Sequence, residues 1–213
     1  MRTYGALPAE LGHYDIDCRE FMFYQYLPVK LAGVTEVVME RRLDCFRLIL
    51  GAICCDYVGF RGLNAFVDSY VYLTAKHMVT APGAPMNRPG WHSDGFLTSD
   101  INYIWSDCFP TVFNCSSFSL TLDDEISLDE MSAQAAPYAD CCYGDGTLLR
   151  LDQFCVHRVA DIPAPLVRTF LKVSFSLDRY DLIGNSHNFE LNYDWPMRER
   201  KLTRNVPQPV GKS

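Results

Sequence analysis

An apolar stripe at helical spacing predicts the first element of the chain. Between residues 36 and 57 the apolar positions recur at steps of four and three, so they share one face of a helix. These positions are Met39, Leu43, Phe46, Leu50, Ile53 and Tyr57. Thr35 can cap the start of this helix, and Gly59 lies just beyond its end. The stripe therefore predicts a helix over residues 36–57 that packs against a core.

Beyond residue 65 the pattern changes to short segments of β type, rich in Val, Ile, Tyr, Phe and Thr and separated by turn residues. The segments are 67–79, 101–107, 111–120, 147–152, 155–159 and 168–178. Residues 82–90 hold three Pro and two Gly, which indicates a loop. Residues 127–130 have the form of a capping box for a short helix that ends near residue 136. Helices followed by about eight short strands predict a helix-supported β-barrel or a double-sheet sandwich.

Composition is that of one ordinary globular domain. The chain has 213 residues, of which 48% are hydrophobic and 21% are charged. The net charge of −7 is unevenly spread, because residues 198–213 carry +4 and the rest of the chain carries −11. The acidic body argues against a protein that binds nucleic acid over its whole surface. For the basic tail, a solvated C-terminus is the favoured interpretation, and a nucleic-acid contact is the alternative.

The cysteines and the N-terminus bear on the compartment. Nine cysteines occur without any C-x-x-C, so no zinc-ribbon or redox motif is present. The N-terminus lacks the basic start and apolar core of a signal peptide. We therefore expect reduced thiols in a cytoplasmic protein. The longest apolar run, residues 48–55, is too short to cross a bilayer.

The sequence His92-Ser93-Asp94 is the first candidate for chemistry. In a strand, residues i and i+2 point to the same face, so His92 and Asp94 can reach one ion together. His157, in a later strand-like segment, can complete a set of two histidines and one carboxylate. Such a set leaves open coordination positions on Fe(II). The competing interpretation is a satisfied structural histidine at each position.

A cation follows His157 on the next predicted strand. One parity of that strand holds Arg168, Phe170, Lys172, Ser174 and Ser176, which therefore share one face. If this face points inward, its cations need an anion, and the planar guanidinium of Arg168 suits a carboxylate. The competing interpretation is an edge strand whose polar face is exposed to solvent.

The order His-x-Asp, then His, then a basic residue on the next strand resembles the Fe(II)/2-oxoglutarate-dependent dioxygenase superfamily, over about residues 67–180. The resemblance implies a double-stranded β-helix, which is a jelly-roll or cupin-like barrel, with supporting N-terminal α-helices. It implies that His92, Asp94 and His157 bind Fe(II) and that Arg168 binds the distal carboxylate of 2-oxoglutarate. The implied activity is oxidation of a substrate by O₂, most simply hydroxylation, with release of succinate and CO₂ and stimulation by ascorbate. Asp94 argues against a halogenating variant, because those relatives lack the carboxylate.

Two details depart from the pattern of that superfamily. Many members carry Arg-x-Ser at the carboxylate site. Here Lys172 is followed two residues later by Ser174, whereas the residue two positions after Arg168 is Phe170. We favour Arg168, because its short offset from His157 lets the next strand return past the iron, and Lys172 is the alternative. No residue stands out as the hydroxyl partner of that carboxylate, for which Tyr103 and Tyr72 are candidates.

The expected organisation is one integrated domain. It has an N-terminal helical support (residues 1–66), a β core (67–182) and a C-terminal extension with the basic tail (183–213). Two other functions stay open: a cupin-like metalloenzyme that does not use 2-oxoglutarate, which would need further His or Glu ligands, and a non-catalytic ligand-binding barrel. The acidic body favours a small molecule, an amino acid or a protein side chain as substrate. Because the C-terminal tail is basic, nucleic acid is the alternative substrate or partner. No membrane partner is expected.

Overall fold

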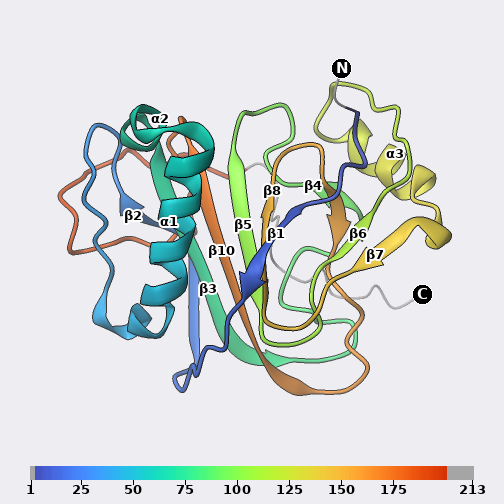
Figure 1. The fold of residues 1–213 in the computed structure, drawn as a ribbon, viewed down its shortest axis with the longest axis horizontal. Helices are drawn as coiled ribbons and strands as arrows, with labels where there is room; N and C mark the ends of the chain where they lie inside the picture. The colour runs from blue at the N-terminus through green and yellow to red at the C-terminus, as the bar shows by residue number, and fades with distance from the viewer. Residues whose placement is uncertain (1–2, 201–213) are drawn as a thin grey trace.

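Two antiparallel sheets packed against each other form the centre of the molecule (Figure 1). The computed structural model describes residues 3–200. The large sheet has the order β1-β8-β5-β10-β3-β2, with strands β1 (Ala9–His13), β2 (Met22–Lys30), β3 (Tyr70–Thr80), β5 (Ile101–Ser106), β8 (Thr147–Leu151) and β10 (Leu166–Ser176). The small sheet has the order β4-β9-β6-β7, with strands β4 (His92–Ser93), β6 (Val112–Asn114), β7 (Asp140–Cys142) and β9 (Val156–Arg158). The prediction of a mainly β fold with few helices is confirmed.

From β3 to β10 the chain crosses repeatedly between the two sheets. Strands β3, β5, β8 and β10 belong to the large sheet, and β4, β6, β7 and β9 belong to the small one. These crossings make β4 and β9 neighbours in the small sheet, although they lie far apart in the sequence. The topology therefore brings the segment around His92 against the segment around His157.

Helices cover the outer face of the large sheet, on the left in Figure 1. They are the 3-10 helix η1 (Arg41–Phe46), α1 (Arg47–Arg61) and α2 (Leu63–Asp68). The predicted stripe does pack into the core, but the helix begins later than expected, because the backbone N–H of Val38 donates to the carbonyl of Val29 on β2. Thr35 is therefore no cap, and Gly59 lies inside α1, which ends before Gly62 with its positive φ of 90°. Glycine suits such a left-handed position at a helix end.

The inner face of the large sheet is unusually polar for a buried surface. The small sheet packs against this inner face, and helices cover the outer face. Strands β3 and β10 are therefore buried over most of their length. Between apolar residues such as Ile104 and Phe170, this face carries Lys76, Asn102 and Lys172, each less than 9% exposed. Buried polar groups destabilise a fold unless they are hydrogen-bonded or serve a ligand. The inner face is thus where a functional site is expected.

Residues outside the central core also join the large sheet. The predicted helical support, residues 1–66, contributes strands β1 and β2 as well as helices. In the C-terminal extension, Asn188 Nδ2 donates to the carbonyls of Pro28 and Val38, which fixes the extension to β2. The remaining elements are α3 (Ile126–Gln134) and the 3-10 helix η2 (Pro137–Ala139). The N-terminus of α3 is capped by Asp123, whose carboxylate accepts the N–H groups of Glu125 and Ile126, and not by the predicted box at 127–130.

Two further observations concern the expected compartment and tail. Across residues 3–200, no helix has the length and apolar character needed to cross a bilayer. The nine cysteines, all within the described part, form no disulfide. In the basic tail, Arg198 forms an ion pair with Asp181, whereas Lys201, Arg204 and Lys212 lie outside the described residues.

Candidate metal centre and its pocket

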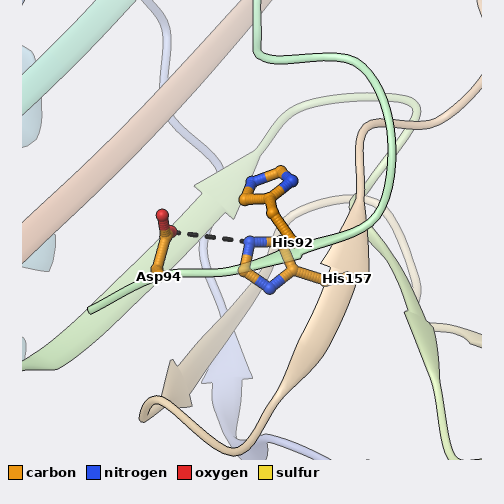
Figure 2. Close-up of side chains that lie close together, drawn as sticks. All are labelled: His92, Asp94 and His157. Carbon is orange, nitrogen blue, oxygen red and sulfur yellow. Dashed lines mark ion pairs between the residues drawn. The ribbon is translucent and has the colours of Figure 1, made fainter. Parts of the chain in front are cut away.

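His92, Asp94 and His157 converge at one end of the interior between the sheets (Figure 2). His92 on β4 lies directly opposite His157 on β9 in the antiparallel register. Asp94 follows β4 by one residue and points to the same side. One ligand atom from each of the three side chains lies within 4.8 Å of the others. Metal–ligand bonds of about 2.0–2.2 Å require only a small further closure, so this group can hold a metal ion.

Backbone carbonyls orient both imidazole rings. Nδ1 of His92 lies 2.9 Å from the carbonyl of Gly90, and Nδ1 of His157 lies 2.9 Å from the carbonyl of Cys155. Because a carbonyl only accepts hydrogen bonds, each Nδ1 must carry the proton, which leaves the Nε2 lone pair free for a metal. Burial and the neighbouring His157 lower the pKa of His92 to about 3. His92 is therefore neutral at physiological pH, as a metal ligand must be.

Lys172 of β10 lies directly beside the carboxylate of Asp94, the third candidate ligand. Its Nζ lies 2.7 Å from Oδ2 of Asp94, and the same oxygen lies 3.5 Å from Nε2 of His157. Burial alone would raise the pKa of Asp94, but the Lys172 ammonium and the contact with His157 hold it well below its usual range. Asp94 is consequently ionised and available to a cation.

The chain turns sharply after Asp94 and is held there by Gln153. Gly95 has a φ of +71°, and a Cβ at this position would lie 2.8 Å from Oγ1 of Thr98. Gln153 Nε2 donates to the carbonyl of Thr98, and Gln153 Oε1 accepts the N–H of Leu97. Gln153 thus ties the turn to the corner between β8 and β9. Sequence reasoning missed this role, since nothing distinguishes one glutamine at a predicted corner.

A pocket of about 670 Å³ opens on the three candidate ligands. Its walls come from the inner face of the large sheet, the small sheet, α3 and the segment after β10. Two buried ammonium groups line it, those of Lys172 and Lys76. Lys76 Nζ donates to the carbonyl of Met86 and to Oδ1 of Asn87. Lys76 was not singled out from the sequence, although a lysine inside the apolar segment 67–79 was a usable signal.

Arg168 lies on the same face of β10 as Lys172, four residues earlier, and is not among the pocket-lining residues. It is fully buried, and its Nε and Nη2 donate to the carbonyls of Cys108 and Phe109. Its Nη1 has no hydrogen-bond partner among the described residues. The structure therefore separates the two predicted cations: Lys172 is beside the candidate metal ligand Asp94, and Arg168 is buried outside the pocket lining with one donor unsatisfied.

Tyr103 and Tyr72 do not reach the pocket. Tyr103 alternates with Asn102 and Ile104 along β5, so it points to the helix-covered face, where its hydroxyl donates to Asp56 Oδ2 on α1 at 2.7 Å. Tyr72 is fully buried, and its hydroxyl donates to the carbonyl of Asp178. The expectation that either phenol contacts a cofactor carboxylate does not agree with these positions. Tyr103 has the outward parity of β5, whereas Tyr72 shares the inward parity of Lys76 but is not among the residues that line the pocket.

We expect the substitution Tyr103→Phe to lower stability and to leave cofactor binding unchanged. It removes one hydrogen bond to a charged group, which is worth about 1.5–3 kcal/mol. Thermal or denaturant unfolding measures this loss, and Tyr138→Phe is the matched control because Tyr138 is 94% exposed. A tyrosine that contacted the cofactor would instead weaken cofactor binding when its hydroxyl is removed.

Comparisons with solved structures find a distant likeness, and comparisons with family models and curated proteins find none. The crystal structure of EvdO2 from Micromonospora carbonacea var. aurantiaca aligns with a TM-score of 0.41 at 12% sequence identity. The alignment covers 65% of this chain and 66% of that chain, slightly less than two thirds of its length.

Proposed function

We propose that this protein is a non-haem Fe(II) and 2-oxoglutarate-dependent dioxygenase. The observation that carries the proposal is a group of two histidines and one carboxylate that opens on a pocket lined by two buried cations, Lys172 and Lys76. A third buried cation, Arg168, lies on the same face of β10 outside the lining. Two His and one carboxylate form the facial set that leaves open positions on Fe(II). No other group of His, Cys, Asp and Glu within residues 3–200 has a metal-binding arrangement. A cupin-like site with additional His or Glu ligands is therefore less well supported.

The buried cations favour a dianionic cosubstrate. Burial, together with the charges of Lys172 and Arg168, lowers the pKa of Lys76 to about 8. Within residues 3–200, Lys172 pairs with Asp94, but no carboxylate forms an ion pair with Lys76 or Arg168. Neighbouring like charges in a desolvated site destabilise it unless an anion joins them. A 2-oxo dicarboxylate supplies two negative charges, and the unpaired Nη1 of Arg168 is a donor suited to one carboxylate.

The fold suits the same assignment. The alternation of most strands from β3 to β10 between two sheets would suit the path of a double-stranded β-helix, with helices supporting its large sheet. His92, Asp94 and His157 would hold the iron at the end of this barrel, with Lys172 orienting the carboxylate. Bound iron and 2-oxoglutarate would supply oxidative decarboxylation to succinate and CO₂, coupled to oxidation of the substrate. The cytoplasm, where thiols stay reduced, suits this chemistry.

The decisive experiment loads the wild-type protein with Fe(II) without oxygen and then adds 2-oxoglutarate. We expect a visible metal-to-ligand absorption band, because a 2-oxo acid can chelate through its keto and carboxylate oxygens. Succinate, which lacks the keto group, is the matched control and should give no band. On admission of O₂ and ascorbate, slow release of succinate should follow even without a substrate. Iron binding without the band would favour the metalloenzyme that does not use 2-oxoglutarate, and no iron binding would favour a non-catalytic barrel.

A further inference from the structure

The pocket wall contains two buried polar side chains, Asp100 and Asn102, that neither iron nor 2-oxoglutarate explains. Asp100 immediately precedes β5, and Asn102 is the second residue of that strand. Both line the pocket, although Asp100 is only 5% and Asn102 only 1% exposed. Residues at i and i+2 of an extended segment present their side chains on one face, about 6–7 Å apart. The two groups therefore form one edge of the pocket wall.

Asn102 retains an unsatisfied donor. The hydroxyl of Ser174 on β10 donates to Oδ1 of Asn102 at 2.6 Å and holds the amide in place. Nδ2 of the same amide has no hydrogen-bond partner among the described residues. Buried polar groups are nearly always paired in folded proteins, and an unpaired one is destabilising. An acceptor on a ligand in the pocket would satisfy Nδ2.

Asp100 has a tyrosine as its hydrogen-bond partner and no direct ion pair among the described residues. The hydroxyl of Tyr180 donates to its Oδ2 at 2.6 Å, and burial followed by the charge of Asp100 raises the pKa of Tyr180 well above its usual range. Tyr180 is thus a fixed, protonated donor. The ammonium of Lys172 lies in the same pocket wall and is influenced by the charge of Asp100, but its direct ion pair is with Asp94. Within residues 3–200 no Lys, Arg or His forms an ion pair with Asp100, so a cationic ligand group would be stabilised beside it.

We propose that Asp100 and Asn102 recognise the substrate, and that the substrate is a small molecule of the α-amino acid class. Its ammonium group would bind to the carboxylate of Asp100, and its neighbouring carboxylate or carbonyl would accept from Asn102 Nδ2. A pocket of about 670 Å³ is of the size that encloses a small molecule. The oxidation of this substrate rests on the proposed function, whereas its binding does not.

The test measures thermal stabilisation of the full-length wild-type protein, without metal, by the common L-α-amino acids and by their N-acetyl derivatives. Acetylation removes the positive charge and keeps the rest of the molecule. We expect at least one free amino acid to raise the melting temperature, and its N-acetyl form to bind at least about tenfold more weakly, because a charge-assisted contact is lost. The same amino acid should accelerate succinate release once iron and 2-oxoglutarate are present. Equal binding of free and acetylated forms, or no stabilisation by any amino acid, would overturn the proposal.

Two variants test whether the binding of the amino acid depends on Asp100 and Asn102. Asp100→Asn and Asn102→Ala should each weaken binding of the responding amino acid by about tenfold or more. Asp129→Asn is the matched control, because it removes one acidic charge from an exposed position of α3 outside the pocket. Full affinity in Asp100→Asn would contradict the proposal, and the free-versus-acetylated comparison decides the matter if the variant does not fold. If iron and 2-oxoglutarate fail to bind while the amino-acid response depends on Asp100, the proposed function fails and this binding site stands.

Discussion

The substitution His157→Ala is expected to abolish most Fe(II) binding, and Asp94→Ala is expected to do the same. Each removes one of the three proposed protein ligands, and the remaining two cannot close the facial set. The loss of affinity should exceed the ten- to hundredfold that removal of an outer contact of a metal ligand typically causes. Iron content after anaerobic loading and desalting is the measurement. Retention of full iron occupancy by His157→Ala would show that the metal, if any, binds elsewhere.

His77→Ala and His13→Ala provide the controls for this experiment. His77 on β3 has its Nδ1 2.9 Å from Oγ1 of Thr169, and His13 on β1 pairs with the exposed Asp15. Neither ring belongs to the His92 group. Both variants should therefore keep the wild-type iron content, which separates loss of a ligand from loss of any histidine. Circular dichroism of all variants checks that the fold survives.

The candidate ligands could be found from the sequence because part of their geometry is local. His92 and Asp94 share a face through the two-residue period of an extended chain, which needs no tertiary information. His157 depends on a long-range pairing of β9 with β4, which the sequence does not encode by itself. Its identification relied on the order of residues in a resembling superfamily. The structure then placed the two strands side by side.

Other features depended on facts that no local pattern contains. The start of the predicted helix was wrong because the strand partner Val29 takes the N–H of Val38. Tyr103 as a partner of the cofactor carboxylate does not agree with the structure, because the inward parity of β5 is set by which face the helices cover. Lys76 was overlooked, since its burial on the inner face follows from packing of the small sheet against the large one. The inward face of a strand, the start of a helix and the burial of a side chain can therefore be assigned only when the packing of the two sheets is known.

The three buried cations should separate into two kinds when each is replaced by the uncharged methionine. We expect Arg168→Met to weaken 2-oxoglutarate binding by about ten- to a hundredfold, because a hydrogen bond to a charged group is worth about 1.5–3 kcal/mol. Iron binding should survive, since Arg168 contacts none of the three ligands. Titration of the anaerobic absorption band measures the first effect, and iron content measures the second. Lys76→Met is measured in parallel, because Lys76 lines the pocket between Arg168 and Lys172.

Lys172→Met should behave differently, because Lys172 contacts the carboxylate ligand itself. Its ammonium lies 2.7 Å from Asp94 Oδ2, so it competes with a metal ion for that oxygen and repels the metal charge. Removing it should lower the stability of the metal-free protein, where Asp94 would be left buried without a counter-ion, and should raise the affinity for Fe(II). Its effect on 2-oxoglutarate affinity should be smaller than that of Arg168→Met. If Lys172→Met or Lys76→Met proves severe for 2-oxoglutarate and Arg168→Met proves mild, the distal carboxylate binds at the pocket lysines. If none of the three variants changes the absorption titration, the cosubstrate is not a dicarboxylate held by this face.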